Sequence, residues 1–156
     1  MPKEITQSEA YDKCAAEGSF IFLLESDADR VASMVEIAEE QLKAAKSLSG
    51  EKLWNSTYKL YYDTLHSLAE AFLLLDKIKS RNHLCLFAYL CEKYPSLELD
   101  WNFFEKIRTK RNGITYYGTP VNDKDWKEVE LQFQLYTDLL KKEIRQKLEG
   151  WRSSPD

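Results

Sequence analysis

The strongest constraint on the fold is a repeat of apolar side chains at steps of three and four residues, clearest in residues 52–79. The repeating positions are Trp54, Tyr58, Tyr61, Leu65, Leu68, Phe72 and Leu75. Such spacing places them on one face of a helix. Tyr62, Ala69 and Ala71 widen this face, so we predict that this long helix is the central one.

The same periodicity predicts the other helices, and the composition agrees with it. We expect them near residues 7–17, 28–48, 83–93, from 99 to 111 or beyond, and 123–148. Only 5 Gly and 4 Pro occur, too few for an all-β protein with many tight turns. The sequence therefore predicts an all-α protein, an antiparallel up-and-down helical bundle with short connections.

Length and local composition indicate one domain over residues 1–156. We expect a short N-terminal extension over residues 1–26, in which the apolar run 19–25 is extended or irregular. The bundle itself is predicted over residues 27–149, with "SDAD" (26–29) supplying the N-cap of its first long helix. A polar tail, 150–156, follows it.

The net charge and the cysteines indicate which ligands and which cellular compartment to expect. The net charge of −4 gives no overall case for nucleic acid, so any such case depends on local basic clusters. Cys14, Cys85 and Cys91 are odd in number and form no CxxC or CxxH group. We expect them to be reduced and mostly buried.

No apolar run approaches the ~20 residues of a membrane span, and the start lacks the apolar region of a signal peptide, so we expect a cytoplasmic protein without a membrane partner.

The usual motifs of metal and cofactor sites are absent from the sequence. His66 and His83 have no HxxxH or ExxH spacing, and neither a GxxxxGK loop nor a GxSxG elbow occurs. We therefore expect no metal and no cofactor. We place His66 at the edge of the core, and His83 at a helix start where it bonds to nearby backbone.

Arg111 is the residue that most suggests a site. It lies four residues beyond Ile107 and seven beyond Phe104, and so continues the inward stripe of its helix. A guanidinium stays charged, and burying it alone is costly. Arg111 must therefore either pair with a carboxylate or face a cleft or a partner.

Two basic clusters accompany Arg111 in the sequence. Lys106, Arg108 and Lys110 surround it, and "DKIKSR" (76–81) ends the preceding long helix. If the two helices run the same way, both clusters lie at one pole of the bundle and form a positive patch suited to phosphate. The alternative is that cations at helix C-termini merely complement the helix dipole.

Three segments carry a resemblance to a known family. They are the helix "ADRVASMVEIAEEQLKAAKSL", the tyrosine-rich helix that precedes the short "LCLFAYL" helix, and "KIRTKRNGITYYG". In order and spacing the chain resembles HEPN domains over about residues 28–148, with the last segment where the HEPN signature belongs. The resemblance implies a helical bundle that forms a homodimer with two signatures face to face.

The family signature is an arginine, usually a polar residue, three more residues and a histidine. Arg111 and Asn112 match it, whereas Tyr116 stands at the position of the histidine. Many HEPN proteins are metal-independent ribonucleases, and several are toxins paired with a nucleotidyltransferase antitoxin. Histidine titrates near neutrality and serves as base or acid, but tyrosine titrates near pH 10. The resemblance thus makes Arg111, Asn112 and Tyr116 the catalytic residues of any activity, with a weakened base.

Three functions follow from these residues. The first is a dimer that binds RNA or nucleotide phosphate, with weak or absent nuclease activity. The second is an active ribonuclease of a toxin–antitoxin pair, using Tyr116 or His83. The third is an interaction bundle in which the motif only builds the dimer seam, with Arg111 and Asn112 pairing across it to Glu105 or Asp100. The expected ligand-binding residues are Arg81, His83, Arg108, Lys110, Arg111, Asn112, Tyr116 and Tyr117.

Overall fold

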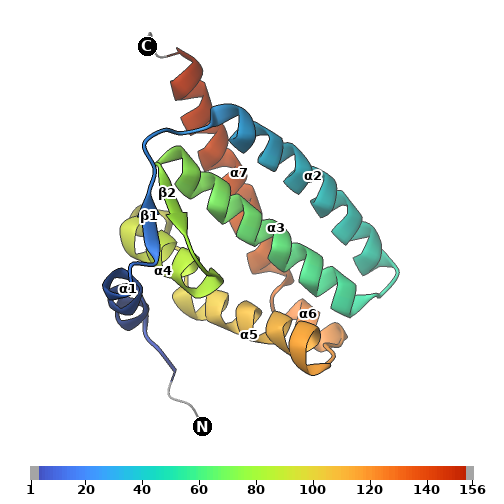
Figure 1. Cartoon of the computed structure of the whole chain (residues 1–156). Coiled ribbons are helices and arrows are strands. Elements are labelled where there is room, and N and C mark those ends of the chain that lie inside the picture. Colours follow the sequence, from blue (N-terminus) through green and yellow to red (C-terminus); the bar gives the residue numbers. More distant parts are fainter. Residues whose placement is uncertain (1–3, 154–156) are drawn as a thin grey trace.

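The computed structural model describes residues 4–153 and is an all-α helical bundle with one small β-ribbon (Figure 1). Its elements in chain order are α1 (Gln7–Ala16), β1 (Phe20–Phe22), α2 (Ala28–Gly50), α3 (Trp54–Leu75), β2 (Ile78–Ser80), α4 (His83–Lys93), the 3₁₀ turn η1 (Pro95–Leu97), α5 (Trp101–Tyr117), α6 (Asp123–Lys127) and α7 (Glu130–Ser153). The predicted fold class is confirmed. Among the helices of residues 4–153, none combines the length and apolar character that a membrane-spanning helix requires.

Side-chain caps explain where several helices begin. Asp27 accepts a hydrogen bond from the backbone N–H of Arg30 at the start of α2, as predicted from "SDAD". Asn122 and Asp125 form a reciprocal capping box at α6. The predicted last helix is therefore two helices, α6 and α7, and α7 continues into the predicted polar tail. Residues 154–156 of that tail, and residues 1–3 of the predicted extension, lie outside the described residues.

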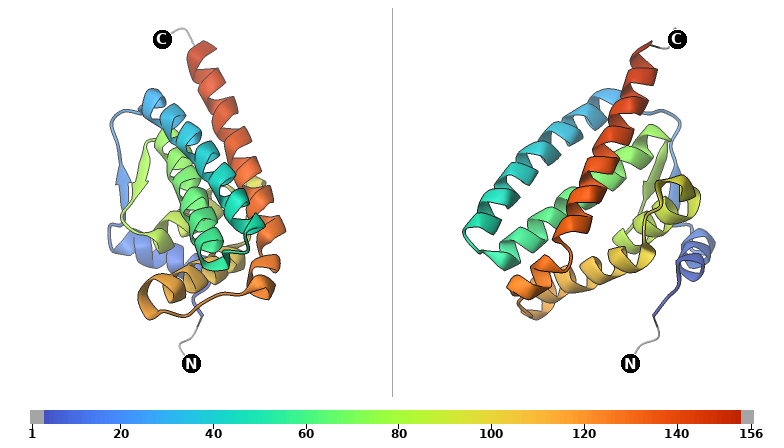
Figure 2. Two further views of the ribbon diagram at one scale, coloured as in Figure 1. Left: turned by 90° about the vertical axis from the view of Figure 1, so that its right-hand side faces the viewer. Right: turned by 180° about the vertical axis from the view of Figure 1, so that it is seen from behind.

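The central position predicted for α3 is confirmed by its contacts. α3 packs against α2, α4, α5, α6, α7 and β2. In Figure 1, α2 lies along one side of α3 and α5 along the other, and Figure 2 shows α7 covering the back of the bundle. α3 is buried almost all round because both its apolar stripe and the wider face predicted beside it find partners.

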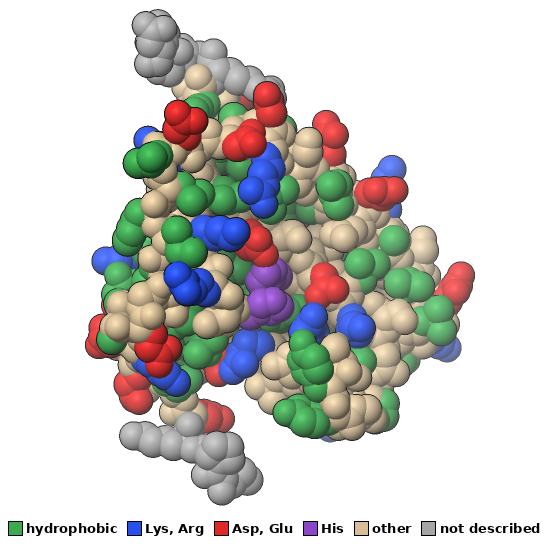
Figure 3. Space-filling model, viewed as in Figure 1, with side chains coloured by type: hydrophobic (Ala, Val, Ile, Leu, Met, Phe, Trp, Pro, Cys, Tyr) green, Lys and Arg blue, Asp and Glu red, His purple; other side chains and the backbone are tan. Residues whose placement is uncertain are grey.

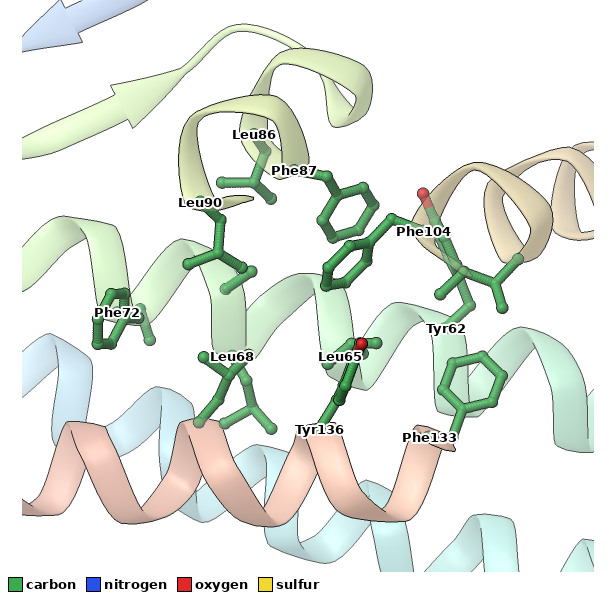
Figure 4. Close-up of a cluster of buried hydrophobic side chains, with 14 of the residues drawn as sticks. Tyr62, Leu65, Leu68, Phe72, Leu86, Phe87, Leu90, Phe104, Phe133 and Tyr136 are labelled. Carbon is green, nitrogen blue, oxygen red and sulfur yellow. The ribbon is translucent and has the colours of Figure 1, made fainter. Parts of the chain in front are cut away.

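The core is rich in aromatic rings where α3, α4, α5 and α7 meet (Figure 4). Phe87 of α4 and Phe104 of α5 stack at 4.5 Å between centroids. Phe103 of α5 lies edge-on to Phe133 and Tyr136 of α7. These contacts fix α5 against the rest of the bundle, and with it the segment that carries Arg111.

The direction of α5 differs from the sequence expectation. Arg111 lies beside Asp63, and Val121, just past the end of α5, donates its backbone N–H to Asn55 at the start of α3. α5 therefore runs antiparallel to α3, and the two predicted basic clusters do not share a pole. Instead, β2 turns the chain back along α3 and delivers the start of α4 to Arg111 (Figure 1).

Residues 4–26 are part of the fold rather than an appendage. β1 pairs antiparallel with β2, with Ile21 opposite Lys79, and α1 packs on α4. Cys14 of α1 and Cys85 of α4 form a disulfide, so the expectation of reduced thiols is wrong for these two. Their chain positions are far apart, and only packing of α1 on α4 brings them together. Cys91 is free and buried, as expected.

A thiol count tests this disulfide. In unfolded protein that has not been reduced, Ellman's reagent should detect one thiol per chain, that of Cys91. After reduction it should detect three. The double variant Cys14→Ser/Cys85→Ser should lose ~2–4 kcal/mol of unfolding free energy, because the cross-link restricts the unfolded chain. Three reactive thiols before reduction would show that the pair is not bonded in the purified protein.

Candidate functional site

An open pocket of about 330 Å³ lies where the start of α4 faces the C-terminal half of α5. Its walls are formed by Asn82, His83, Leu84, Arg108, Arg111, Asn112 and Tyr116. The tertiary structure thus brings together five of the predicted ligand-binding residues: His83, Arg108, Arg111, Asn112 and Tyr116.

Arg111 is well buried, with 16% of its side chain exposed, yet its donors are poorly used. Nη2 lies 3.8 Å from Oδ1 of Asp63, and Nη1 donates to Oδ1 of Asn112 at 3.3 Å. Nε is buried without a hydrogen-bond partner among the described residues. The guanidinium lies over the rings of Tyr62, at 5.5 Å, and Tyr116, at 5.8 Å. Both sequence alternatives therefore hold: Arg111 has a distant carboxylate and also faces a pocket.

His83 is the first residue of α4, which Asn82 caps by accepting from the backbone N–H of Cys85. Its Nδ1 lies 2.9 Å from the hydroxyl of the buried Tyr62. The expected bond to nearby backbone is therefore wrong, because β2 carries His83 to the middle of α3. Burial, the neighbouring His66 and Arg111 lower the pKa of His83 to about 4. The imidazole is consequently neutral at pH 7.

His66 belongs to this site and was not predicted in it. Its ring contacts that of His83, with centroids 3.9 Å apart, and its Nδ1 lies 2.8 Å from Oε1 of Glu70. That hydrogen bond lowers the pKa of Glu70. Figure 3 shows the two histidines side by side in a hollow of the surface, with cationic and acidic side chains around them. Only 15% of the His66 side chain is exposed, in line with its predicted place at the edge of the core.

One sequence signal could have found this arrangement. Tyr62, His66 and Glu70 follow one another at four-residue steps, which places them in a row on one face of α3. From the sequence we place Tyr62 on the widened apolar stripe and His66 at the edge of the core, and neither interpretation identifies the row as a site. The approach of His83 to this row depends on β2 and carries no comparable local signal.

Acidic side chains neutralise much of the positive charge of the basic cluster on α5. Arg108 binds Glu105 through two hydrogen bonds of 3.0 and 3.1 Å, which raise its pKa. Lys110 lies 3.5 Å from Asp125 of α6. Lys106 is similarly paired with an acidic residue next to α6. The patch predicted from sequence is therefore narrower than expected, and Arg111 is its least neutralised member.

The other predicted ligand-binding residues lie beside the pocket. Lys110 and Tyr117 line a neighbouring hollow of about 430 Å³ beyond the end of α5, and Asn112 borders both cavities. Tyr116 and Tyr117 are 66% and 79% exposed, so neither packs into the core. Arg81 is exposed and precedes the pocket, and its backbone N–H donates to the carbonyl of Ser19.

The chemistry of the pocket follows from its donors. A guanidinium, a second arginine and the start of a helix all favour an anion. No group of three or more His, Cys, Asp or Glu in residues 4–153 is arranged to hold a metal ion. Comparisons with models of protein families, with curated proteins and with solved structures found no match for this chain.

The environment of His83 predicts a pH dependence of stability. Its pKa in the folded protein, about 4, lies below the ordinary value of 6.5, so the unfolded chain binds this proton more readily. The resulting stabilisation is complete above pH 6.5 and is lost as the pH falls toward 4. Between pH 7 and pH 5, wild type should lose unfolding free energy as this proton binds to the unfolded chain. The loss in His83→Asn, measured in urea titrations, should be about 1 kcal/mol smaller. Equal losses would show that His83 does not resist protonation.

Proposed function

We propose that this protein is a HEPN-like homodimer that binds single-stranded RNA or nucleotide phosphate in the pocket between α4 and α5. The observation that carries the proposal is Arg111, a largely buried arginine that lines a pocket and whose partners are one long hydrogen bond to Asn112 and a carboxylate at 3.8 Å. A ligand with several acceptor oxygens would supply what the chain itself does not. Phosphate matches the fork of a guanidinium through two parallel hydrogen bonds.

The start of α4 adds a second favourable element. His83 and Leu84 are its first two residues, whose backbone N–H groups find no carbonyl within the same helix. Both residues line the pocket, so an anion bound there lies at the positive end of the helix dipole. Arg108 lies across from them, where its charge remains although Glu105 binds it.

The exposed tyrosines favour a nucleic acid over a lone phosphate. Tyr116 lines the pocket, and Tyr117 lies at its neighbour, both with most of their rings free of the core. Unstacked bases of single-stranded RNA commonly stack on such rings, while the phosphates meet cations. Two pockets that share Asn112 offer room for more than one nucleotide.

The other two functions predicted from sequence are separable from this one. The interaction bundle needs Arg111 to pair with Glu105 or Asp100 of a second copy; within the chain, Glu105 binds Arg108 and Asp100 caps α5. The ribonuclease of a toxin–antitoxin pair, with a nucleotidyltransferase as partner, is favoured by one observation, the presence of His83 in the pocket. A binding experiment with RNA that lacks free 2′-hydroxyls tests binding apart from cleavage.

Arg111→Ala should weaken binding of fluorescent single-stranded 2′-O-methyl RNA by about tenfold or more, the cost of one arginine–phosphate fork. Arg111→Lys keeps the charge but loses the fork, and should recover only part of the affinity. Arg145→Ala is the matched control, because Arg145 is an exposed arginine paired with Glu39 far from the pocket. Its affinity should stay within about twofold of wild type. The measurement is fluorescence anisotropy at fixed salt.

Two results would contradict the proposal. Wild type that binds no RNA at micromolar concentration would remove it. Equal losses in Arg111→Ala and Arg145→Ala would mean that only net charge matters. Loss of the dimer in Arg111→Ala, measured by light scattering and without any RNA binding by wild type, would favour the interaction bundle instead.

Tyr116 allows a separate test of base stacking. Tyr116→Phe keeps the ring and should bind the same RNA within about twofold, whereas Tyr116→Ala should lose about fivefold to a hundredfold, the value of one base–aromatic stack. Since Tyr116 is largely exposed, neither variant should change the melting temperature by more than about 2 °C. Equal affinities of Tyr116→Ala and wild type would show that the ring makes no contact with RNA.

A further inference from the structure

The two histidines have opposite environments although their rings touch. Nδ1 of His66 lies 2.8 Å from the carboxylate of Glu70, which can accept a hydrogen bond from it. Nδ1 of His83 faces only the hydroxyl of Tyr62, while His66 and two arginines oppose a positive charge there. A carboxylate thus adjoins one ring and a neutral hydroxyl the other, an asymmetry that suits one imidazole to act as acid and its neighbour as base.

In each histidine Nδ1 has a polar partner within the chain, which leaves Nε2 to interact with a ligand. Glu70 occupies Nδ1 of His66, and Tyr62 occupies Nδ1 of His83. No hydrogen bond within residues 4–153 involves Nε2 of either ring. His83 lines the pocket that holds Arg111, and the ring of His66 lies directly against that of His83, with centroids 3.9 Å apart.

The geometry points to a catalytic pair: His83 is the general base and His66 the general acid in cleavage of an RNA phosphodiester held by Arg111. The pair does not include the residue at the signature histidine position, Tyr116, although that residue lines the same pocket. It lies wholly within one chain, since α3 supplies the acid and α4 the base. The inference rests on the proposed function, because it requires RNA phosphate in the pocket.

The reaction balances without any further reactant. With Nδ1–H donated to Tyr62, Nε2 of His83 takes the proton from the 2′-hydroxyl, whose oxygen attacks the adjacent phosphorus. The bond from phosphorus to the 5′-oxygen breaks, and that oxygen takes the proton from Nε2 of His66. The products are a 2′,3′-cyclic phosphate and a free 5′-hydroxyl. His83 then holds the proton that His66 has lost, and exchange with water restores both.

The surrounding groups suit this division of roles. Arg111 lies where negative charge grows on the phosphate oxygens, which favours the transition state. Glu70 is a positioning residue: its contact with Nδ1 orients the ring of His66 without touching RNA. The 2′- and 5′-oxygens flank one phosphorus atom, so two adjacent imidazoles can serve the same phosphodiester.

The test is cleavage of single-stranded RNA at pH 7 in EDTA, with products resolved by mass spectrometry. Wild type should yield 2′,3′-cyclic phosphate ends. His66→Gln and His83→Gln should each slow cleavage by about a hundredfold or more, the usual contribution of an acid or a base. Arg145→Ala, which removes an exposed arginine paired with Glu39 outside the pocket, is the control and should stay within about threefold.

A substrate with sulfur in place of the 5′-bridging oxygen separates the roles. Because a thiolate leaves without a proton, this substrate should restore cleavage by His66→Gln and by Glu70→Gln to near the wild-type rate. His83→Gln should stay slow with it, since the base is still needed. A merely structural defect in any variant would persist with both substrates.

The outcomes are distinguishable from those of the binding proposal. Wild type that binds 2′-O-methyl RNA but leaves RNA intact overturns the catalytic pair and leaves the binding function standing. Cleavage that survives His83→Gln, or that depends on Tyr116 instead, also overturns it. Absence of binding by wild type removes both proposals. Circular dichroism of each variant establishes that it is folded.

Discussion

The packing of α3 on nearly all of its sides is the constraint on which the rest of the structure depends. One face of α3 joins α2 and α7 in the core, so its opposite face must meet α4 and α5. That second face carries Tyr62 and His66, which are polar at their tips and apolar in their rings. Because they are buried against α4 and α5, their polar atoms need hydrogen-bonding partners. The candidate site consists largely of those partners.

The electrostatics of the site follow from this burial. Desolvation disfavours charge on His83 and raises the pKa of the Tyr62 hydroxyl, which therefore keeps its proton. Arg111 cannot respond in the same way, because a guanidinium stays protonated. It instead keeps its charge over two tyrosine rings with a distant carboxylate, an arrangement that leaves it suited to an anion.

The sequence predicted the helices well because each depends on local pattern. The apolar spacing identified α3 and its central place, and "SDAD" marked the start of α2. Expectations that depended on the direction of packing were less successful. The two basic clusters lie apart because α5 runs against α3, and a cysteine pair 71 residues apart in sequence is bonded because α1 folds onto α4.

The candidate site likewise has a part that local sequence predicts and a part that depends on tertiary packing. The sequence alone determined that Arg111 points inward, because a residue four beyond Ile107 shares its helix face, and that Asn112 and Tyr116 accompany it. Only the tertiary structure decided that His83 and His66 join them. A three-residue strand, β2, reverses the chain and sets the start of α4 beside the middle of α3, and the length and direction of that return depend on packing between distant segments rather than on any local preference of their residues.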